Sequence, residues 1–187
     1  RKLKSLGYKN IITTKRKNLN FLDKEKTETF LKKKKPDYVI IASAKVGGIF
    51  SNNTFPADYI YQNLSIELNL IHGAYLAGVK NLLFLGSSCV YPKNCKQPIK
   101  EDYLLNGVLE KTNEAYSIAK IAGIKICESY SKQYKLNYFS VMPCNVYGPN
   151  DKYDLLSSHF IPALINKIHT AKIKKQKKIK LWGSGKP

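Results

Sequence analysis

Two side chains one helical turn apart, Tyr116 and Lys120, are the first arrangement in this sequence that could carry out acid–base chemistry. The residues around them are expected to be helical, and an i,i+4 spacing then places both side chains on one face. A free phenol titrates at about 10, and an ammonium group nearby favours the phenolate and lowers that pKa. A tyrosine placed in this way can pass a proton to or from a carbonyl oxygen as a hydride arrives or leaves. Because the chain has 13 tyrosines and many lysines, the spacing alone is a weak signal.

A second group of candidate side chains follows an apolar strand expected at residues 81–85. The chain continues there through Gly86, Ser87, Ser88 and Cys89 to Pro92. In an α/β sheet, a hydroxyl at the carboxyl end of a central strand is well placed to bind a substrate. The alternative for Ser87 is a simple turn or helix cap.

Elements that could hold these side chains alternate along the chain. Helices are expected at residues 1–6, 23–34, 58–77, 113–135 and 158–171, with Gly7, Pro36 and Gly78 as stops and Asp23 as a cap. Strands are expected at residues 10–14, 37–42, 81–85, 136–142 and 178–182, and residues 45–56 are expected to form a loop. Repeated βα units predict an α/β fold with a doubly wound parallel sheet and helices on both faces. Ligands of such sheets bind at the carboxyl ends of the strands.

Two burial patterns follow from these elements. The strand at residues 37–42 is a nearly continuous apolar run, which is typical of a strand buried on both faces. The helix at residues 58–77 is expected to bury an apolar stripe, made of Ile60, Leu64, Leu68, Ile71 and Tyr75.

Composition excludes several classes of protein. The hydrophobic fraction of 43% is enough for a core, yet no apolar run approaches the roughly 18 residues of a membrane span. The net charge of +19 would suit nucleic acid, but Arg1 and Arg16 are the only arginines among 32 basic residues, and base and phosphate recognition favour arginine. We therefore expect no membrane and no nucleic acid as partner.

The four cysteines, at positions 89, 95, 127 and 144, lack the close spacing of a zinc or redox motif. No metal site is predicted from them. Since no secretory signal is visible, they are expected to be reduced thiols in a cytoplasmic protein.

The segments around these candidates resemble the extended short-chain dehydrogenase/reductase family, which has a Rossmann-type fold. The resemblance is carried by a hydroxyl residue after a strand, by the Tyr-x-x-x-Lys pair, and by Asn145-Val146-Tyr147-Gly148-Pro149 after the next strand. By this resemblance, Ser87, Tyr116 and Lys120 form the catalytic triad, and Lys120 also holds the nicotinamide ribose.

Within the family, the chain is most similar to enzymes that epimerise C3 and C5 of GDP-4-keto-6-deoxymannose and then reduce C4 with NADPH. Residues 44–54, 61–63, 86–92, 110–116, 158–164 and 182–185 carry that likeness. It implies that Cys89 and His159 are the acid/base pair of epimerisation. Both carbons lie α to the ketone, and a thiol at about 8.5 and an imidazole at about 6.5 can exchange protons at cellular pH. The alternatives are an inert buried thiol for Cys89 and a helix N-terminal residue satisfied by backbone for His159.

The resemblance also implies a site for NADP(H) and contacts to the substrate. The cofactor residues would be Arg16, Leu85, Gly86, Ser87, Ser88, Lys120, Pro143, Cys144, Asn145, Val146 and His159, and the substrate residues Lys167 and Trp182. NADPH is expected over NADH, because no carboxylate that would bind a ribose 2′-hydroxyl occurs between Thr14 and Asp23, whereas Arg16 suits a 2′-phosphate. Cys144 stands where the family usually has threonine, which weakens one cofactor contact.

We expect the chain to be a fragment truncated at both ends, in which residues 1–187 form a partial NADP-binding domain. The first strand and the Gly-rich phosphate loop would then be missing, and residues from about 150 to 187 would begin the substrate-binding region. The full-length protein is expected to be a homodimer, and the fragment itself to bind cofactor poorly. Two alternatives stay open: another nucleotide-sugar epimerase or dehydratase of the family, which would need the triad but neither Cys89 nor His159, and a non-catalytic basic protein whose binding collapses with salt.

Overall fold

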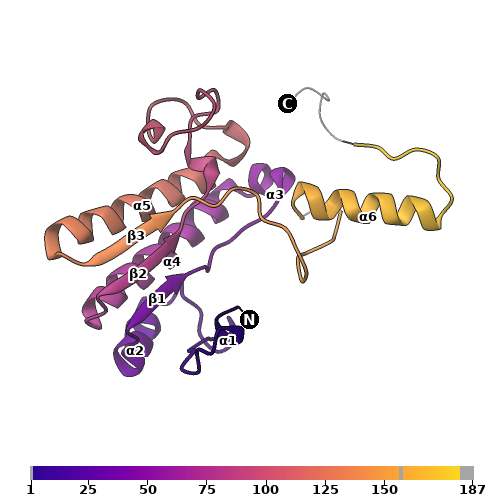
Figure 1. Ribbon diagram of the computed structural model, residues 1–187. Helices are drawn as coiled ribbons and strands as arrows, with labels where there is room; N and C mark the ends of the chain where they lie inside the picture. Colours follow the sequence, from indigo (N-terminus) through magenta and orange to yellow (C-terminus); the bar gives the residue numbers. More distant parts are fainter. Residues whose placement is uncertain (1, 156–157, 182–187) are drawn as a thin grey trace.

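A parallel three-stranded sheet forms the centre of the protein in a computed structural model that describes residues 2–155 and 158–181. Its strands are β1 (Tyr38–Ile41), β2 (Asn81–Leu85) and β3 (Asn137–Val141), in the order β1-β2-β3 (Figure 1). Ile41 pairs with Phe84, and Phe84 pairs with Ser140. The predicted parallel α/β arrangement is confirmed, and the carboxyl ends of all three strands meet at one edge of the sheet.

Within the described residues, one layer of helices covers one face of this sheet, and the second helical layer expected on the other face is not seen there. α4 (Pro56–Leu76) packs against both α5 (Glu114–Tyr134) and α2 (Lys24–Lys34), and α5 also packs on β2 and β3. The remaining helices are α1 (Lys2–Ser5), α3 (Ile49–Thr54) and α6 (Phe160–Ile173), with 3-10 turns η1 (Ser88–Val90), η2 (Glu101–Tyr103) and η3 (Lys111–Asn113). α6 extends away from the sheet (Figure 1). Among the described residues, no helix is both long enough and apolar enough to cross a membrane.

The hydrophobic core lies between the sheet and this helical layer. Leu82, Phe84 and Tyr138 point into it and are almost completely buried. Successive side chains of a strand point to opposite faces, so Tyr38 and Ile40 lie on the other face, where they are 73% and 52% exposed. The prediction that residues 37–42 are buried on both faces is therefore wrong for these alternate positions.

The buried face of α4 also differs from the predicted apolar stripe. Tyr59, Asn63 and Glu67 are fully buried, whereas Leu68 is 49% exposed. Asn63 is held there because its side-chain oxygen accepts from the Lys45 backbone N–H at 2.8 Å and its amide donates to the Lys45 and Tyr59 carbonyls. The buried face of α4 thus combines apolar side chains, among them Ile71 of the predicted stripe, with polar side chains that have specific partners.

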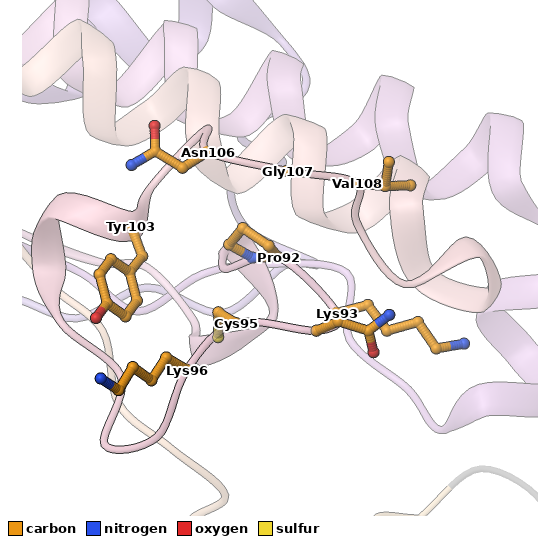
Figure 2. A pocket seen from close by; sticks show the side chains of 9 residues that line it. Pro92, Lys93, Cys95, Lys96, Tyr103, Asn106, Gly107 and Val108 are labelled. Atoms are coloured by element: carbon orange, nitrogen blue, oxygen red, sulfur yellow. The ribbon is translucent and has the colours of Figure 1, made fainter.

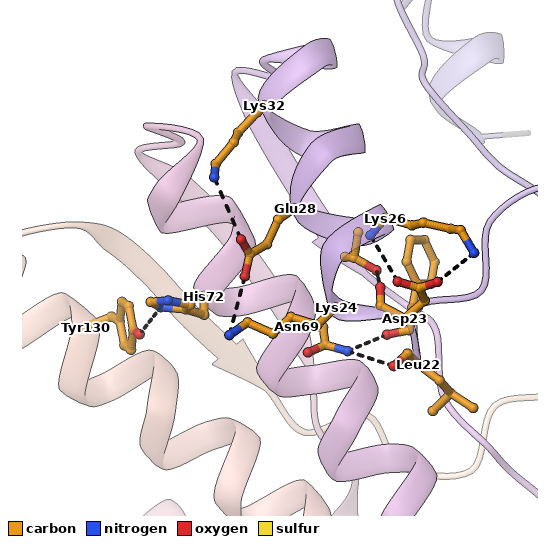
Figure 3. A network of polar contacts seen from close by, with 11 residues as sticks. Leu22, Asp23, Lys24, Lys26, Glu28, Lys32, Asn69, His72 and Tyr130 are labelled. Carbon is orange, nitrogen blue, oxygen red and sulfur yellow. Dashed lines mark hydrogen bonds and ion pairs between the residues drawn. The ribbon is translucent and has the colours of Figure 1, made fainter.

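Side-chain contacts fix the start of α2 and join the three helices (Figure 3). The predicted cap is confirmed: Asp23 accepts from the Lys26 backbone N–H at 3.1 Å and forms an ion pair with the Lys26 ammonium at 2.7 Å. The Asn69 amide on α4 donates to the Phe21 carbonyl at 2.8 Å, in the turn that precedes α2. On the other side of α4, His72 Nδ1 lies 2.7 Å from the Tyr130 hydroxyl of α5.

Three predicted elements need correction. Residues 10–14 and 178–181 form no strand, because within the part of the chain that is described they have no neighbouring strand to pair with; Trp182 lies outside the described residues. The loop predicted at residues 45–56 contains the six-residue helix α3. The Asn52 side-chain amide donates to the Gly47 carbonyl at 2.8 Å, which stabilises that helix at its start.

Candidate functional site at the carboxyl edge of the sheet

The loops that follow β2 and β3 are hydrogen-bonded to each other at the carboxyl edge. The Gly86 N–H donates to the Val141 carbonyl at 2.8 Å, and the Ser88 N–H donates to the Pro143 carbonyl at 3.3 Å. A β-carbon on Gly86 would lie 3.2 Å from that same Val141 oxygen, which explains why a glycine suits this position. The segments that follow β2 and β3 are thus held together at this edge.

Tyr116, in the first turn of α5, lies beside the loop after β2. Burial and, to a smaller extent, the charge of Cys89 raise the pKa of Tyr116 to about 12, although a hydrogen bond with the Ser87 hydroxyl opposes both. Ser87 is also the cap of η1, since its oxygen accepts from the Cys89 backbone N–H at 3.3 Å. The capping and the site interpretations of Ser87 are therefore compatible. Ser87, Cys89 and Tyr116 form one cluster, in which the tyrosine is protonated at neutral pH.

Lys120 lies one turn along α5, but its ammonium is directed into the protein. Its Nζ donates to the Leu85 carbonyl at 3.1 Å, lies 3.1 Å from Glu67 Oε1, and is 4.6 Å from the centre of the Phe84 ring. The centre of the Tyr116 ring is 5.8 Å away. The expectation that Lys120 lowers the pKa of Tyr116 is wrong for this structure, because the Glu67 carboxylate offsets the lysine's charge and burial of the phenol dominates.

Glu67 is the member of this site that the sequence analysis missed. Its side chain is 1% exposed, and burial raises the pKa of Glu67 to about 7 in spite of the opposing effect of Lys120. One signal could have found it: Tyr59, Asn63 and Glu67 follow one another at intervals of four, so that three polar side chains share one face of a helix.

Cys89 and His159 lie in different elements, Cys89 in η1 and His159 directly before α6. Cys89 is a partly exposed free thiol in η1, next to Tyr116. His159 is the exposed residue before α6, its side chain makes no capping hydrogen bond, and its carbonyl accepts from the Ala163 N–H at 3.1 Å. No contact between the described side chains joins it to Cys89.

The expected cofactor residues lie at or near the same edge. Arg16 lines a cavity of about 260 Å³ together with residues that follow β1, among them Ala42 and Lys45, and with Gln62 of α4. Residues 143–146 follow β3, and Cys144, Asn145 and Val146 are exposed. Of the two expected substrate residues, Lys167 lies on α6 and donates to the Lys180 carbonyl at 3.1 Å, and Trp182 lies outside the described residues.

A larger cavity, of about 610 Å³, was not predicted. It lies in the long loop between β2 and α5 and is lined by Pro92, Lys93, Asn94, Cys95, Lys96, Tyr103, Asn106, Gly107 and Val108 (Figure 2). The Lys93 ammonium in its wall is paired with Glu110 at 2.7 Å. Residues 2–155 and 158–181 contain no group of three or more His, Cys, Asp or Glu side chains that could hold a metal ion.

A comparison against known protein families agrees with the parallel α/β sheet. The model of the NAD dependent epimerase/dehydratase family matches residues 1–187. The chain belongs to this family. Membership confirms the predicted Rossmann-type fold and the resemblance to extended short-chain reductases.

Two individual proteins are similar in sequence to most of this chain. A GDP-L-fucose synthase of Sinorhizobium fredii is 58% identical over 177 residues, which are 95% of this chain and 56% of that protein. A GDP-L-fucose synthase of Escherichia coli is 51% identical over 187 residues, covering 100% of this chain and 58% of that protein. This chain therefore spans a little over half the length of the curated relatives it matches.

Solved structures of two similar proteins share the fold of this chain. A GDP-L-fucose synthetase from Naegleria fowleri bound to NADP has a TM-score of 0.85 and 28% sequence identity, and the match covers 99% of this chain and 61% of that one. A GDP-6-OMe-4-keto-L-xylo-heptose reductase from C. jejuni has a TM-score of 0.89 and 38% identity, over 95% of this chain and 51% of that one.

Proposed function

We propose that the full-length protein converts GDP-4-keto-6-deoxymannose into GDP-L-fucose, by epimerisation at C3 and C5 and reduction at C4 with NADPH. The observation that carries this proposal is the 58% and 51% identity to two proteins named GDP-L-fucose synthase. That identity spans the segment in which Ser87, Cys89, Tyr116 and Lys120 gather at the carboxyl edge of the sheet.

NADP(H) is the cofactor that we propose for this edge, where the bound dinucleotide would supply the hydride. The cavity beside Arg16 supports it, since a guanidinium can bind a ribose 2′-phosphate through two parallel hydrogen bonds. Lys120 would hold the nicotinamide ribose once its ammonium, which is 3% exposed and directed into the protein, turns toward this edge. Residues 85–88 and 143–146, among them Leu85, Gly86, Ser88 and Pro143, would line the nicotinamide end. The NADP-bound relative from Naegleria fowleri has the same fold.

For the reduction step, we assign the proton transfer to Tyr116. A phenol with a pKa of about 12 is protonated at neutral pH, so it can donate its proton to the C4 oxygen as the hydride reaches C4. Ser87, which is hydrogen-bonded to the phenol, would donate to the same C4 oxygen and orient it.

For the epimerisation steps, we assign Cys89 as the base. Its thiolate would take the proton from C3 or C5, which leaves an enolate stabilised by the adjacent C4 carbonyl. His159 would return a proton to the opposite side of the carbon and so invert it. His159 is exposed and its side chain makes no capping hydrogen bond, so it is free to act at η1 if α6 approaches that turn. Lys167 of α6 and Trp182 would then contact the substrate.

The proposal also includes a homodimer that acts in the cytoplasm. The apolar side chains of Tyr61 and Leu68 on α4 and Ile118 on α5 are 66%, 49% and 43% exposed, and they could be covered by a second copy. The four free cysteines suit a reducing compartment. Light scattering on the full-length protein should give twice the mass of one chain.

The test of the proposed reaction is product analysis by NMR. The full-length protein, given GDP-4-keto-6-deoxymannose and NADPH, should form GDP-L-fucose and oxidise one NADPH per sugar. A product with an unchanged configuration at C3 and C5 would identify a simple 4-ketoreductase instead. Turnover of a GDP-linked 4-keto-heptose but not of the 6-deoxy sugar would favour the activity named for the C. jejuni relative.

A further inference from the structure

A buried ion pair joins α4 and α5 close to Tyr116, the proposed proton donor. The side chains of Glu67 and Lys120 are 1% and 3% exposed, and Lys120 Nζ lies 3.1 Å from Glu67 Oε1. Burying two charges costs several kcal/mol per ion unless their contacts compensate. The second oxygen of the carboxylate, Glu67 Oε2, is buried and has no hydrogen-bond partner among the described residues. The arrangement is therefore a poor way to stabilise a core, and a role in the site accounts for it better.

The ammonium of Lys120 is held at a defined place by this pair. On one side it donates to the carbonyl of Leu85, the last residue of β2, at 3.1 Å. On another it lies over the Phe84 ring, 4.6 Å from the ring centre. Tyr116, one turn earlier on α5, has its ring centre 5.8 Å away. The two charged groups are close enough to the phenol to affect its ionisation.

The backbone leaves room for the carboxylate at this place only because α5 has a glycine opposite it. A β-carbon on Gly123 would lie 2.8 Å from Glu67 Oε2 and 2.5 Å from Phe84 Cζ. α5 therefore approaches α4 and β2 so closely that the Glu67 side chain has little freedom to move away from Lys120.

We propose that Glu67 is a positioning residue for Lys120: its carboxylate anchors the ammonium beside the Leu85 carbonyl and so decides how much of that positive charge acts on the Tyr116 phenol. When Glu67 is ionised, its negative charge offsets Lys120 and the phenol keeps its proton firmly. When Glu67 is neutral, the ammonium is uncompensated and favours the phenolate. This inference rests on the proposed function in that it takes Tyr116 as the proton donor.

Other ionisable groups face these residues and must be separated from the effect. Tyr116 is also influenced by Cys89 of η1 and Tyr59 of α4. Cys127, one turn beyond Gly123 on α5, faces Glu67, and burial holds its pKa well above the ordinary value, at about 12. Cys127 therefore keeps its proton near neutral pH and cannot produce a response of Tyr116 in that range. The Cys89→Ser variant separates the effect of Cys89 from that of Glu67.

The test is a titration of Tyr116 by NMR in the full-length protein with ¹³Cζ-labelled tyrosine, where Tyr116→Phe identifies the resonance. In the unmodified protein, the Tyr116 signal should shift with an inflection near pH 7, the pKa of Glu67, and the inflection should remain in Cys89→Ser. In Glu67→Gln, the inflection should vanish and the phenol should titrate at least about one pH unit lower, as expected when a unit charge several ångströms away is removed.

The matched control is Glu128→Gln, which removes the carboxylate of an exposed ion pair with Lys125 on the same helix. It should leave the titration of Tyr116 unchanged. The proposal is overturned if the unmodified protein shows no inflection near pH 7, a result that needs no variant to fold, or if Glu67→Gln and Glu128→Gln titrate alike.

Enzyme kinetics provide a second readout. With GDP-4-keto-6-deoxymannose and NADPH, the alkaline limb of the kcat profile should move to lower pH in Glu67→Gln. A normal NMR response without any turnover of this substrate would contradict the proposed function and leave the positioning role intact. Normal turnover with an unmoved alkaline limb would contradict the positioning role alone.

Discussion

Replacing Gly123 by alanine should destabilise the protein, although alanine favours helix more than glycine does. The new β-carbon would lie 2.5 Å and 2.7 Å from Cζ and Cε1 of the Phe84 ring, and 2.8 Å from Glu67 Oε2. Phe84 is fully buried, so its ring cannot swing into solvent. Forcing extra carbon into a packed core costs typically 1–3 kcal/mol, and the gain in helix propensity is about 1 kcal/mol. We expect a net loss of stability of up to about 2 kcal/mol.

Gly73→Ala in α4 is the matched control. There the nearest atom to the new β-carbon is Cδ1 of the Leu31 side chain at 3.0 Å, the end of a side chain that can rotate slightly. The same gain in helix propensity should make this variant neutral or slightly more stable. Urea unfolding of both variants measures the difference as a change of midpoint at constant m-value. If Gly123→Ala proves as stable as Gly73→Ala, the close approach of α5 to Phe84 and Glu67 is wrong.

Three further predictions concern the site. Tyr116→Phe should lower the rate of C4 reduction about 10²–10⁴-fold, the usual contribution of a general acid. Binding of NADPH, measured by fluorescence, is the control and should be unchanged. A rate within twofold of the unmodified protein would remove Tyr116 from the mechanism. Arg16→Ala should weaken binding of NADPH far more than binding of NADH, and an equal loss for both would show that Arg16 does not contact the 2′-phosphate. Folding raises the pKa of Glu67 from 4.5 to about 7, so the folded state binds more protons than the unfolded state. The contribution of Glu67 to stability is therefore complete below pH 4.5 and is lost as the pH rises through 7. The decline, on the order of 3 kcal/mol at most, should appear in urea unfolding of the unmodified protein and be absent in Glu67→Gln; equal slopes would contradict the buried carboxylate.

The sequence predicts most of the sheet and its long helices because their local signals and their packing agree. An apolar run followed by a glycine predicts a strand at residues 81–85, and β2 has these bounds. The polar part of the buried face of α4 could not be predicted from hydrophobicity, because Asn63 and Glu67 are buried through partners that come from Lys45 and Lys120.

The site divides in the same way. The resemblance to extended short-chain reductases placed Ser87 and Tyr116 in one site, and Cys89 follows Ser87 by two residues at the carboxyl end of β2. The buried ion pair of Lys120 could not be predicted from the sequence, since its partner Glu67 comes close only when α4 and α5 pack against each other. The position of His159 relative to Cys89 depends on how α6 is placed, and no spacing in the sequence determines it.

Deuterium exchange at C3 and C5 of GDP-4-keto-6-deoxymannose in heavy water, without NADPH, tests the central claim most directly. Removing NADPH isolates epimerisation from reduction, and each exchanged position reports one proton abstraction. The unmodified full-length protein should exchange both positions, Cys89→Ser should suppress exchange at both, and Cys95→Ser should exchange as the unmodified protein does. Undiminished exchange in Cys89→Ser would show that Cys89 is not the base, and absence of exchange in the unmodified protein would contradict the proposed epimerase activity itself.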